Sequence, residues 1–235
     1  MSDDGHVLWL IDSAAGVTLN GTRYETKSNS GQLAIRLSAV GEVLWFASGS
    51  WQRVLELGGN VVALEEAFPT DPVGGHNIQV RGEGERQFAN LIRPINARWA
   101  GRRIGNEPRL AVWGDDSLRE FDEHGDLKST LNIQGRFIFD VAWFASGIAL
   151  LEFVTSGHGS SEYSGEWRVS TFSSDRQPIG TYPLARGGFE RYDETIGLFQ
   201  TRTNELVAIV PAGIAAAPRN PGSQSWQKIA IRITL

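Results

Sequence analysis

Short runs of apolar residues alternate with glycine-rich or polar turns along the whole chain. Residues 6–12 (HVLWLID), 32–40 (QLAIRLSAV) and 228–235 (KIAIRITL) are such runs. Runs of this kind, rich in Val, Ile, Leu and aromatic residues, predict β-strands. The pair Asn20-Gly21 lies between two alternating segments, which is the strongest local signal for a β-hairpin. Because no stretch carries a helical period over three turns, the pattern predicts an all-β fold.

One phrase of seven residues occurs twice. Residues 43–49 read VLWFASG and residues 141–147 read VAWFASG, an offset of 98 residues (141 − 43). That offset suits two repeats of roughly 40–50 residues, the size of propeller blades. We therefore expect a repeated β unit, with Trp45 and Trp143 packed between neighbouring units as anchors.

Taken in order, the predicted strands group into five units, and 235/5 gives 47 residues for each. The units begin near residues 6, 42, 96, 140 and 192, and the second is expected to form a meander through residues 42–48, 51–57 and 60–67. Both chain ends are predicted strands. If the two end strands shared one sheet, they would close a ring and remove its open edge.

These units resemble β-propeller blades of the WD-repeat and related types. Residues 140–151 resemble the first two strands of a blade and residues 167–172 the third, whereas the Gly-His and Trp-Asp dipeptides of true WD repeats are absent from the expected places. The resemblance implies one domain, residues 1–235, with about five four-stranded blades, a ring closed by the terminal strands, and a face or edge that binds other molecules. The alternative is a two-sheet β-sandwich with a repeated half.

Charge and composition narrow the classes of partner. The 22 basic and 27 acidic residues give a net charge of −5, which offers no general attraction to nucleic acid or to an anionic membrane. Cysteine is absent, which excludes disulfides, thiolate catalysis and cysteine-bound metals and suits a reducing compartment. Residues 1–6 lack the basic start of a secretory signal, and no apolar run reaches the ~18 residues of a membrane span. We expect a soluble, cytoplasmic protein.

Reactive side chains show no strong motif. The four histidines, His6, His76, His124 and His158, are dispersed, so no metal or cofactor is predicted. Carboxylates near predicted strand ends could face a channel as in five-bladed glycoside hydrolases, and they are Asp12, Asp115, Asp116 and Glu194. For the Asp115-Asp116 pair, an ordinary hairpin turn is the favoured interpretation.

Charged residues are unevenly distributed in the middle of the chain. Residues 81–109 are rich in arginine, and residues 115–126 are rich in acidic side chains. We take five residues from these segments as candidate binding residues: Arg98, Arg102, Arg103, Asp115 and Asp116. Acidic residues interrupt the basic segment in an acidic chain, which argues against nucleic acid.

The leading hypothesis is a non-enzymatic propeller that binds another protein. A compact, acidic chain of this size suits an immunity protein that neutralises a bacterial toxin, with a basic toxin domain as its partner. A carbohydrate-binding propeller is the first alternative, and it requires exposed tryptophans among Trp51, Trp99 and Trp226. A glycoside hydrolase is the second alternative, and it requires two carboxylates about 5–9.5 Å apart.

Overall fold

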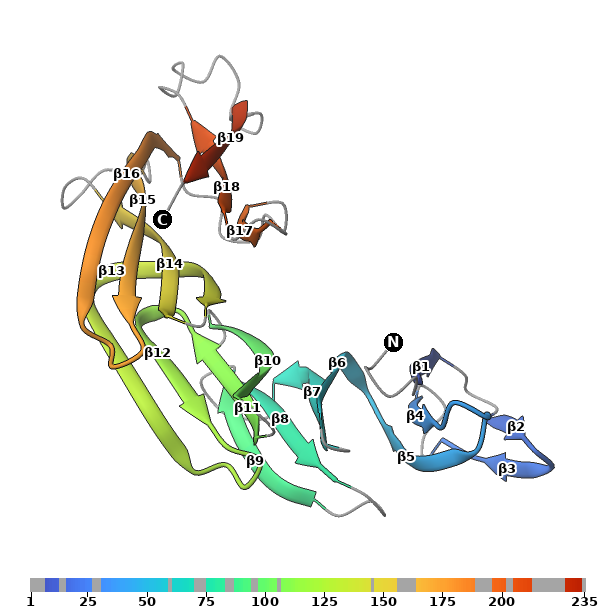
Figure 1. Cartoon of the computed structure of the whole chain (residues 1–235). Helices are drawn as coiled ribbons and strands as arrows, with labels where there is room; N and C mark the ends of the chain where they lie inside the picture. The colour runs from blue at the N-terminus through green and yellow to red at the C-terminus, as the bar shows by residue number, and fades with distance from the viewer. Residues whose placement is uncertain are drawn as a thin grey trace. The chain divides into compact units, whose positions relative to one another are not determined.

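A computed structural model describes most of the chain as β-strands (Figure 1). The described residues are 7–12, 16–26, 31–58, 61–69, 75–82, 87–93, 97–104, 107–144, 146–155, 164–188, 196–201, 205–212 and 227–233. None of them is helical, and so none forms a helix that could cross a membrane. The predicted all-β class is confirmed.

Two compact units make up the chain. The first comprises Met1–Val112 and Arg119–Thr130, and the second comprises Trp113–Leu118 and Leu131–Leu235. Each unit contains sheets packed face to face, as the sandwich alternative expects.

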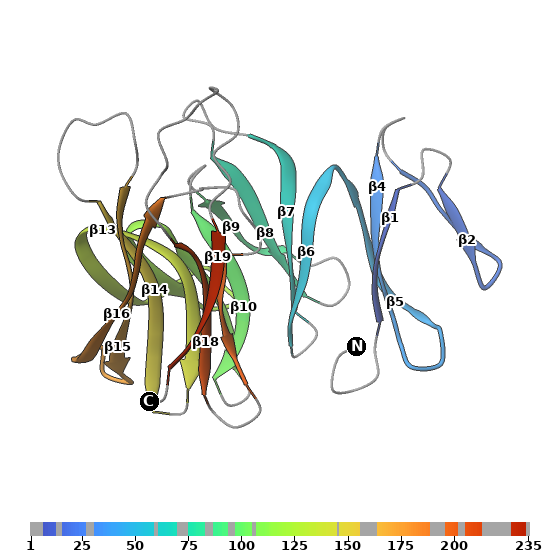
Figure 2. The same ribbon diagram turned by 90° about the horizontal axis from the view of Figure 1, so that it is seen from above.

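The first unit begins with a three-stranded antiparallel sheet in the order β1-β4-β5. Its strands are β1 (Val7–Asp12), β4 (Gln32–Leu37) and β5 (Val43–Gly49), which lie side by side in Figure 2. A separate hairpin joins β2 (Val17–Leu19) to β3 (Thr22–Tyr24). Asn20 and Gly21 in its turn have φ values of 50° and 79°, so the hairpin predicted from Asn-Gly is confirmed.

The next sheet is a four-stranded antiparallel meander in the order β6-β7-β8-β9. Its strands are β6 (Trp51–Gly58), β7 (Val61–Pro69), β8 (His76–Arg81) and β9 (Gln87–Arg93). We expected β5 to belong to this meander, which is wrong, because β5 pairs with β4 along its whole length.

A seven-stranded sheet follows, in chain order from β10 to β16. Its strands are β10 (Arg98–Ile104), β11 (Glu107–Trp113), β12 (Asp115–Phe121), β13 (Leu127–Phe144), β14 (Gly147–Thr155), β15 (Ser164–Ser173) and β16 (Pro178–Gly188). The predicted boundary between the third and fourth units is wrong, because β13 runs through it for 18 residues. Gly135 (φ 71°) lets the strand continue where a side chain would disfavour that backbone.

The last sheet has three strands in the order β17-β18-β19. They are β17 (Gly197–Gln200), β18 (Leu206–Ala212) and β19 (Gln227–Ile233). Because β1 and β19 pair within different sheets, the predicted ring closure by the terminal strands is not confirmed. In the described part of the chain, the sheets have three, four, seven and three strands, with one further hairpin, so five equal four-stranded blades are not present.

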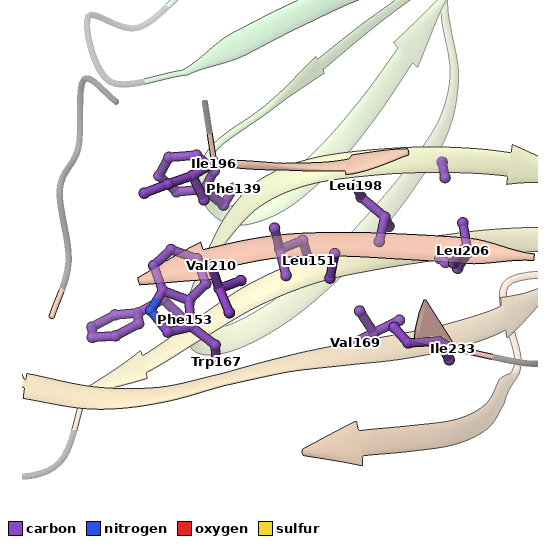
Figure 3. Close-up of a cluster of buried hydrophobic side chains, with 13 residues drawn as sticks. Phe139, Leu151, Phe153, Trp167, Val169, Ile196, Leu198, Leu206, Val210 and Ile233 are labelled. Atoms are coloured by element: carbon purple, nitrogen blue, oxygen red, sulfur yellow. The ribbon is translucent and has the colours of Figure 1, made fainter. Parts of the chain in front are cut away.

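Tight packing between sheets forms the core of the second unit. Figure 3 shows side chains of the seven-stranded sheet facing those of the last sheet. Trp167 is fully buried, and its ring lies edge-on to Phe139 (5.3 Å between ring centroids) and tilted against Phe153 (4.9 Å). Leu198, Leu206, Val210 and Ile233 complete the layer from β17, β18 and β19.

The two copies of the repeated phrase have different structures. The first copy is the continuous strand β5, and its Trp45 packs between the first two sheets with Ala47, Trp51 and Leu64. The second copy turns back on itself, because Phe144 and Gly147 are paired in the β13-β14 hairpin. Trp143 contacts Trp113 of the same sheet edge-on at 5.9 Å. The prediction that Trp45 packs between neighbouring sheets is therefore confirmed. For Trp143, the aromatic ring that it contacts belongs to its own sheet.

The same pair of closing hydrogen bonds joins the first and fifth residues of four hairpin connections. In each, the first residue's N–H donates to the fifth residue's carbonyl (2.8–3.0 Å), and the fifth residue's N–H donates to the first residue's side-chain oxygen (2.9–3.3 Å). These turns are residues 38–42, 122–126, 173–177 and 201–205, and their first residues are Ser38, Asp122, Ser173 and Thr201. A side-chain oxygen at this position closes the turn locally, so each turn forms with little help from neighbouring segments.

Replacing Trp45 by Ala should lower the free energy of unfolding by about 3–5 kcal/mol, because a large ring between two sheets is lost and leaves a cavity. Replacing its exposed neighbour Leu44 by Ala should cost less than about 1 kcal/mol. Urea denaturation of both variants measures the two values. Equal losses for the two would contradict the assignment of Trp45 to the layer between sheets.

Asp122 should make stability depend on acid pH. Burial raises the pKa of its carboxyl, but the Lys128 ammonium and the N–H groups of Asp126 and His124 outweigh burial and hold the pKa below its ordinary value. The stabilisation is therefore complete above the unfolded-state pKa of about 3.9 and disappears as pH falls through the lower native value. Asp122→Asn should be less stable than the parent at pH 7, and the difference should shrink below about pH 4. Urea denaturation between neutral and acid pH measures it, and a constant difference would refute the assignment.

Candidate functional site

Several charged side chains are buried in the sheets, and a buried charge is costly unless it is paired. Arg36 donates to Glu56 across 2.7 Å, Arg93 pairs with Glu65, and Arg168 pairs with Glu152 across 2.9 Å. The pairs differ in how completely their hydrogen-bonding groups are used. That difference separates a structural cluster from a candidate site.

The Glu65 cluster is fully satisfied. Glu65 accepts hydrogen bonds from Arg93 Nε on one oxygen and from Trp99 Nε1 (2.7 Å) on the other. Arg93 also donates to the carbonyl of Ala97 (2.5 Å). These contacts join β7, β9 and the start of β10 within the first unit, so we interpret this cluster as structural.

Arg53 covers the Glu65 cluster from outside. Its guanidinium lies 4.7 Å from the centre of the Trp99 ring and donates to the Trp99 carbonyl (2.7 Å). Partial burial and the charge of Arg93 lower the pKa of Arg53, and the Glu65 carboxylate opposes that effect. The arginine remains a cation, and its stacking protects the cluster from water.

Glu152 on β14 is paired on one oxygen only. Its side chain is completely buried, and Oε2 accepts from Ser170 Oγ (2.9 Å), Arg168 Nε (2.9 Å) and Arg136 Nη1 (3.3 Å). Oε1 is also buried, and no atom of the described residues donates to it. A carboxylate with one unpaired oxygen is poorly arranged for stability, because the unpaired oxygen retains its desolvation cost.

The two arginines of this cluster reach the surface. The side chain of Arg168 is 17% exposed and that of Arg136 is 35% exposed. Each uses one nitrogen on Glu152, and no described residue accepts from their other guanidinium nitrogens. Two cations over one buried carboxylate leave a local charge of +1, carried by donors that face solvent. We call Arg136, Glu152, Arg168 and Ser170 the Glu152 cluster and take it as the candidate site.

Asp116 positions one side of the Glu152 cluster. Its carboxylate accepts from the backbone N–H of Arg136 (3.2 Å), and its own backbone has a φ of 61°. The adjoining Gly114 N–H donates to the Ser117 carbonyl (3.2 Å), so the hairpin-turn interpretation of Asp115-Asp116 fits the backbone. The side chain of Asp115 lies outside the described residues.

The five sequence-predicted binding residues do not form one group within a unit. Arg98, Arg102 and Arg103 lie on β10 in the first unit. Asp115 and Asp116 begin β12 in the second unit. Arg98 is half-buried, and the side chains of Arg102 and Arg103 lie outside the described residues. Of the five, the structure places Asp116 against the Glu152 cluster.

Burial excludes two of the three tryptophans that we considered as platforms for a sugar. Trp51 and Trp99 are 3% and 2% exposed, so neither is the sugar platform that a carbohydrate-binding interpretation needs. Trp226, Glu194 and His158, and the side chain of Asp12, lie outside the described residues. Among the described residues, no three His, Asp or Glu side chains are grouped as metal ligands would be.

Sequence reasoning missed Arg136, Glu152, Arg168 and Ser170. One signal was present: Glu152 is the single charged residue in the apolar run of residues 147–155. A carboxylate in a buried strand needs a cation nearby, but the sequence does not say which of the 22 basic residues supplies it. Strand register supplies the answer, since Arg168 is directly opposite Glu152 on β15.

Comparisons with known proteins give distant structural similarities. No protein-family model matches the chain, and no curated protein sequence matches it. A crystal structure of a protein of unknown function from Bacteroides caccae is similar with a TM-score of 0.44 and 11% identity, covering 95% of this chain and 72% of that one. The tail fiber of Staphylococcus aureus phage P68 is similar with a TM-score of 0.36 and 13% identity, covering 90% of this chain and 45% of that one.

Replacing Glu65 by Gln should lower the free energy of unfolding by about 3–5 kcal/mol, because Arg93 would remain buried without a counter-charge. Glu107→Gln is the matched control, since the side chain of Glu107 is 68% exposed in its pair with Arg109 and an exposed pair contributes about 1 kcal/mol or less. Thermal or urea denaturation compares the two. A Glu65→Gln protein as stable as the control would show that the Glu65 cluster is not a structural brace.

Proposed function

We propose that this chain is a non-enzymatic, protein-binding scaffold whose hairpin turns contact the partner. One observation carries the proposal: every large apolar side chain that is exposed among the described residues lies within two residues of one of the four matching turns. These side chains are Val40 (82% exposed), Leu44 (38%), Leu127 (55%), Ile179 (65%) and Phe199 (48%).

The turns do not need these apolar side chains in order to form. A side-chain oxygen of the first residue closes each turn, and a polar residue at the exposed positions would cost the fold little. A single exposed apolar residue is ordinary on a protein surface, but recurrence at one kind of turn is not. Turns held by rigid sheets are suited to recognition, because they vary in sequence without disturbing the core.

Charge favours a basic partner. The net charge of −5 would attract a cationic protein and repel nucleic acid and anionic lipid. A basic toxin domain neutralised in the cytoplasm by this chain, acting as an immunity protein, is the form of partner that we propose. Antiparallel hairpins that are closed repeatedly by the same hydrogen bonds support the repeat scaffold that the propeller expectation assumes.

Carbohydrate binding and glycoside hydrolysis receive less support. The burial of Trp51 and Trp99 removes two of the three aromatic platforms proposed for a sugar. Asp116, one of the carboxylates considered for hydrolysis, is engaged with the Arg136 backbone. We therefore retain protein binding as the proposed function.

The decisive variant replaces Val40, Leu127 and Ile179 with Ser in the full chain. The partner is captured from the source lysate by the unmodified chain, purified, and its Kd measured for both proteins. Loss of three apolar contacts with the partner should weaken binding about thirtyfold or more. Stability should change little, because the three side chains are exposed.

The matched control replaces the exposed polar strand residues Gln52, Asn132 and Gln134 with Ser. This variant should bind the partner as the unmodified chain does. Equal binding by the turn variant would refute the role of the turns. Failure to capture any partner at physiological salt would refute protein binding itself.

A further inference from the structure

We propose that Arg136 and Arg168 form an oxyanion-binding site on the second unit, with Glu152 as the residue that positions them. The ligand class is a group with two or three anionic oxygens, a carboxylate or a phosphate. The inference goes beyond the proposed protein binding and does not depend on it.

The first argument is the set of unused donors. Arg168 donates from Nε to Glu152, and Arg136 donates from Nη1 to the same residue. The other nitrogens of both guanidinium groups donate to no described residue. Arginine forks bind carboxylate and phosphate oxygens through parallel N–H groups, and such charge-assisted bonds are stronger than neutral ones. Two partly exposed forks therefore present N–H groups to which an anion can bind in place of water.

The second argument is preorganisation. Arg136 is on β13 and Arg168 is on β15, and both reach within hydrogen-bond distance of the same oxygen of Glu152 on the intervening strand β14. The buried carboxylate therefore fixes two long side chains that would otherwise be mobile. Asp116 fixes the Arg136 backbone, and Ser170 holds Glu152 from the side. Because both arginine side chains are already ordered in the free protein, ligand binding loses little free energy to ordering them.

The third argument is the unpaired Oε1 of Glu152. A pair designed for stability would use both carboxylate oxygens, as the Glu65 cluster does. Glu152 leaves one oxygen buried and without a donor among the described residues. The three donors to Glu152 instead converge on Oε2, which brings the two guanidinium groups to one point.

The charges named around the two forks balance, because Arg136, Arg168 and Arg186 are matched in number by Glu152, Glu166 and Asp116. Glu166 lies two positions from Arg168 on the same face of β15, and it is opposite Arg186 on β16. Asp116 is exposed and directs its carboxylate to the Arg136 backbone N–H. Thr181 adds a hydroxyl at the rim, 3.4 Å from Ser170 Oγ. An anion would therefore be bound by the N–H donors of the two guanidinium groups and not by an excess of positive charge.

The test is a titration of the full chain with inorganic phosphate and, separately, with succinate, followed by the arginine Nε–Hε signals in NMR spectra. Ionic strength is held constant with chloride, which also serves as the weak-anion control. We expect a saturable shift of the Arg168 signal. A lower Kd for phosphate assigns the ligand to the phosphate class, and a lower Kd for succinate assigns it to the carboxylate class.

Three variants make the titration specific. Arg136→Gln removes one fork at a partly exposed position and should weaken binding about tenfold. Glu152→Gln preserves shape but removes the negative charge beneath the forks, so it should strengthen anion binding about fivefold. Arg119→Gln, an exposed arginine of β12 in the first unit, is the matched control and should leave binding unchanged.

The increase for Glu152→Gln separates an anion site from a structural pair. If the arginines served only to neutralise Glu152, this variant would lose stability and gain no affinity. A shift no larger than that caused by chloride, or one equal in Arg136→Gln and Arg119→Gln, would overturn the proposal. Because no protein partner is present in the titration, this failure would leave the proposed protein binding untouched, and the converse also holds.

Discussion

Burial of each sheet's apolar face against the next sheet is the interaction on which both units depend. The layer around Trp45 joins the first two sheets, and the layer around Trp167 joins the seven-stranded sheet to the last one (Figure 3). An aromatic side chain buries about 150–250 Å², which contributes about 4–6 kcal/mol before the entropy of ordering is subtracted. The sheets themselves are held by local hairpins, so these layers decide which sheet packs on which.

Local closure by the repeated turn explains how so many strands find their neighbours. Each of the four turns is completed by an oxygen on its first side chain, whether Ser, Asp or Thr. Gly41, Gly125 and Arg176 in the fourth position all have positive φ values. Residues of different type thus give the same geometry, and the shared element is a hydrogen bond rather than a sequence motif. Sequence comparison along the chain therefore detects the repeated tryptophan phrase but not the repeated turn.

The sequence predicted the strands much better than it predicted their partners. Alternation and Asn-Gly found β1, β4 and the β2-β3 hairpin, because those signals are local. The pairing of β5 with β4 and the continuation of β13 past Gly135 depend on contacts and bends that periodicity does not encode. The two phrases share six of seven residues, yet the first forms one strand and the second contains the turn of a hairpin, so their similarity was misleading for the same reason.

The candidate site was harder to predict than the strands, because the role of a buried charge depends on the residues that pair with it. Glu65 and Glu152 are both glutamates in buried strands, and the flanking residues do not say which donors each carboxylate meets. In the fold, Arg93 donates to one oxygen of Glu65 and Trp99 donates to the other, so both oxygens have a partner. Glu152 has three donors on one oxygen and holds two arginines with unused N–H groups.

Strand register alone brings Arg168 opposite Glu152, and a shift of one residue would move the arginine to the opposite face and into the apolar layer. The same register that buries Trp167 and Val169 therefore also builds the Glu152 cluster, so the core and this cluster cannot vary independently.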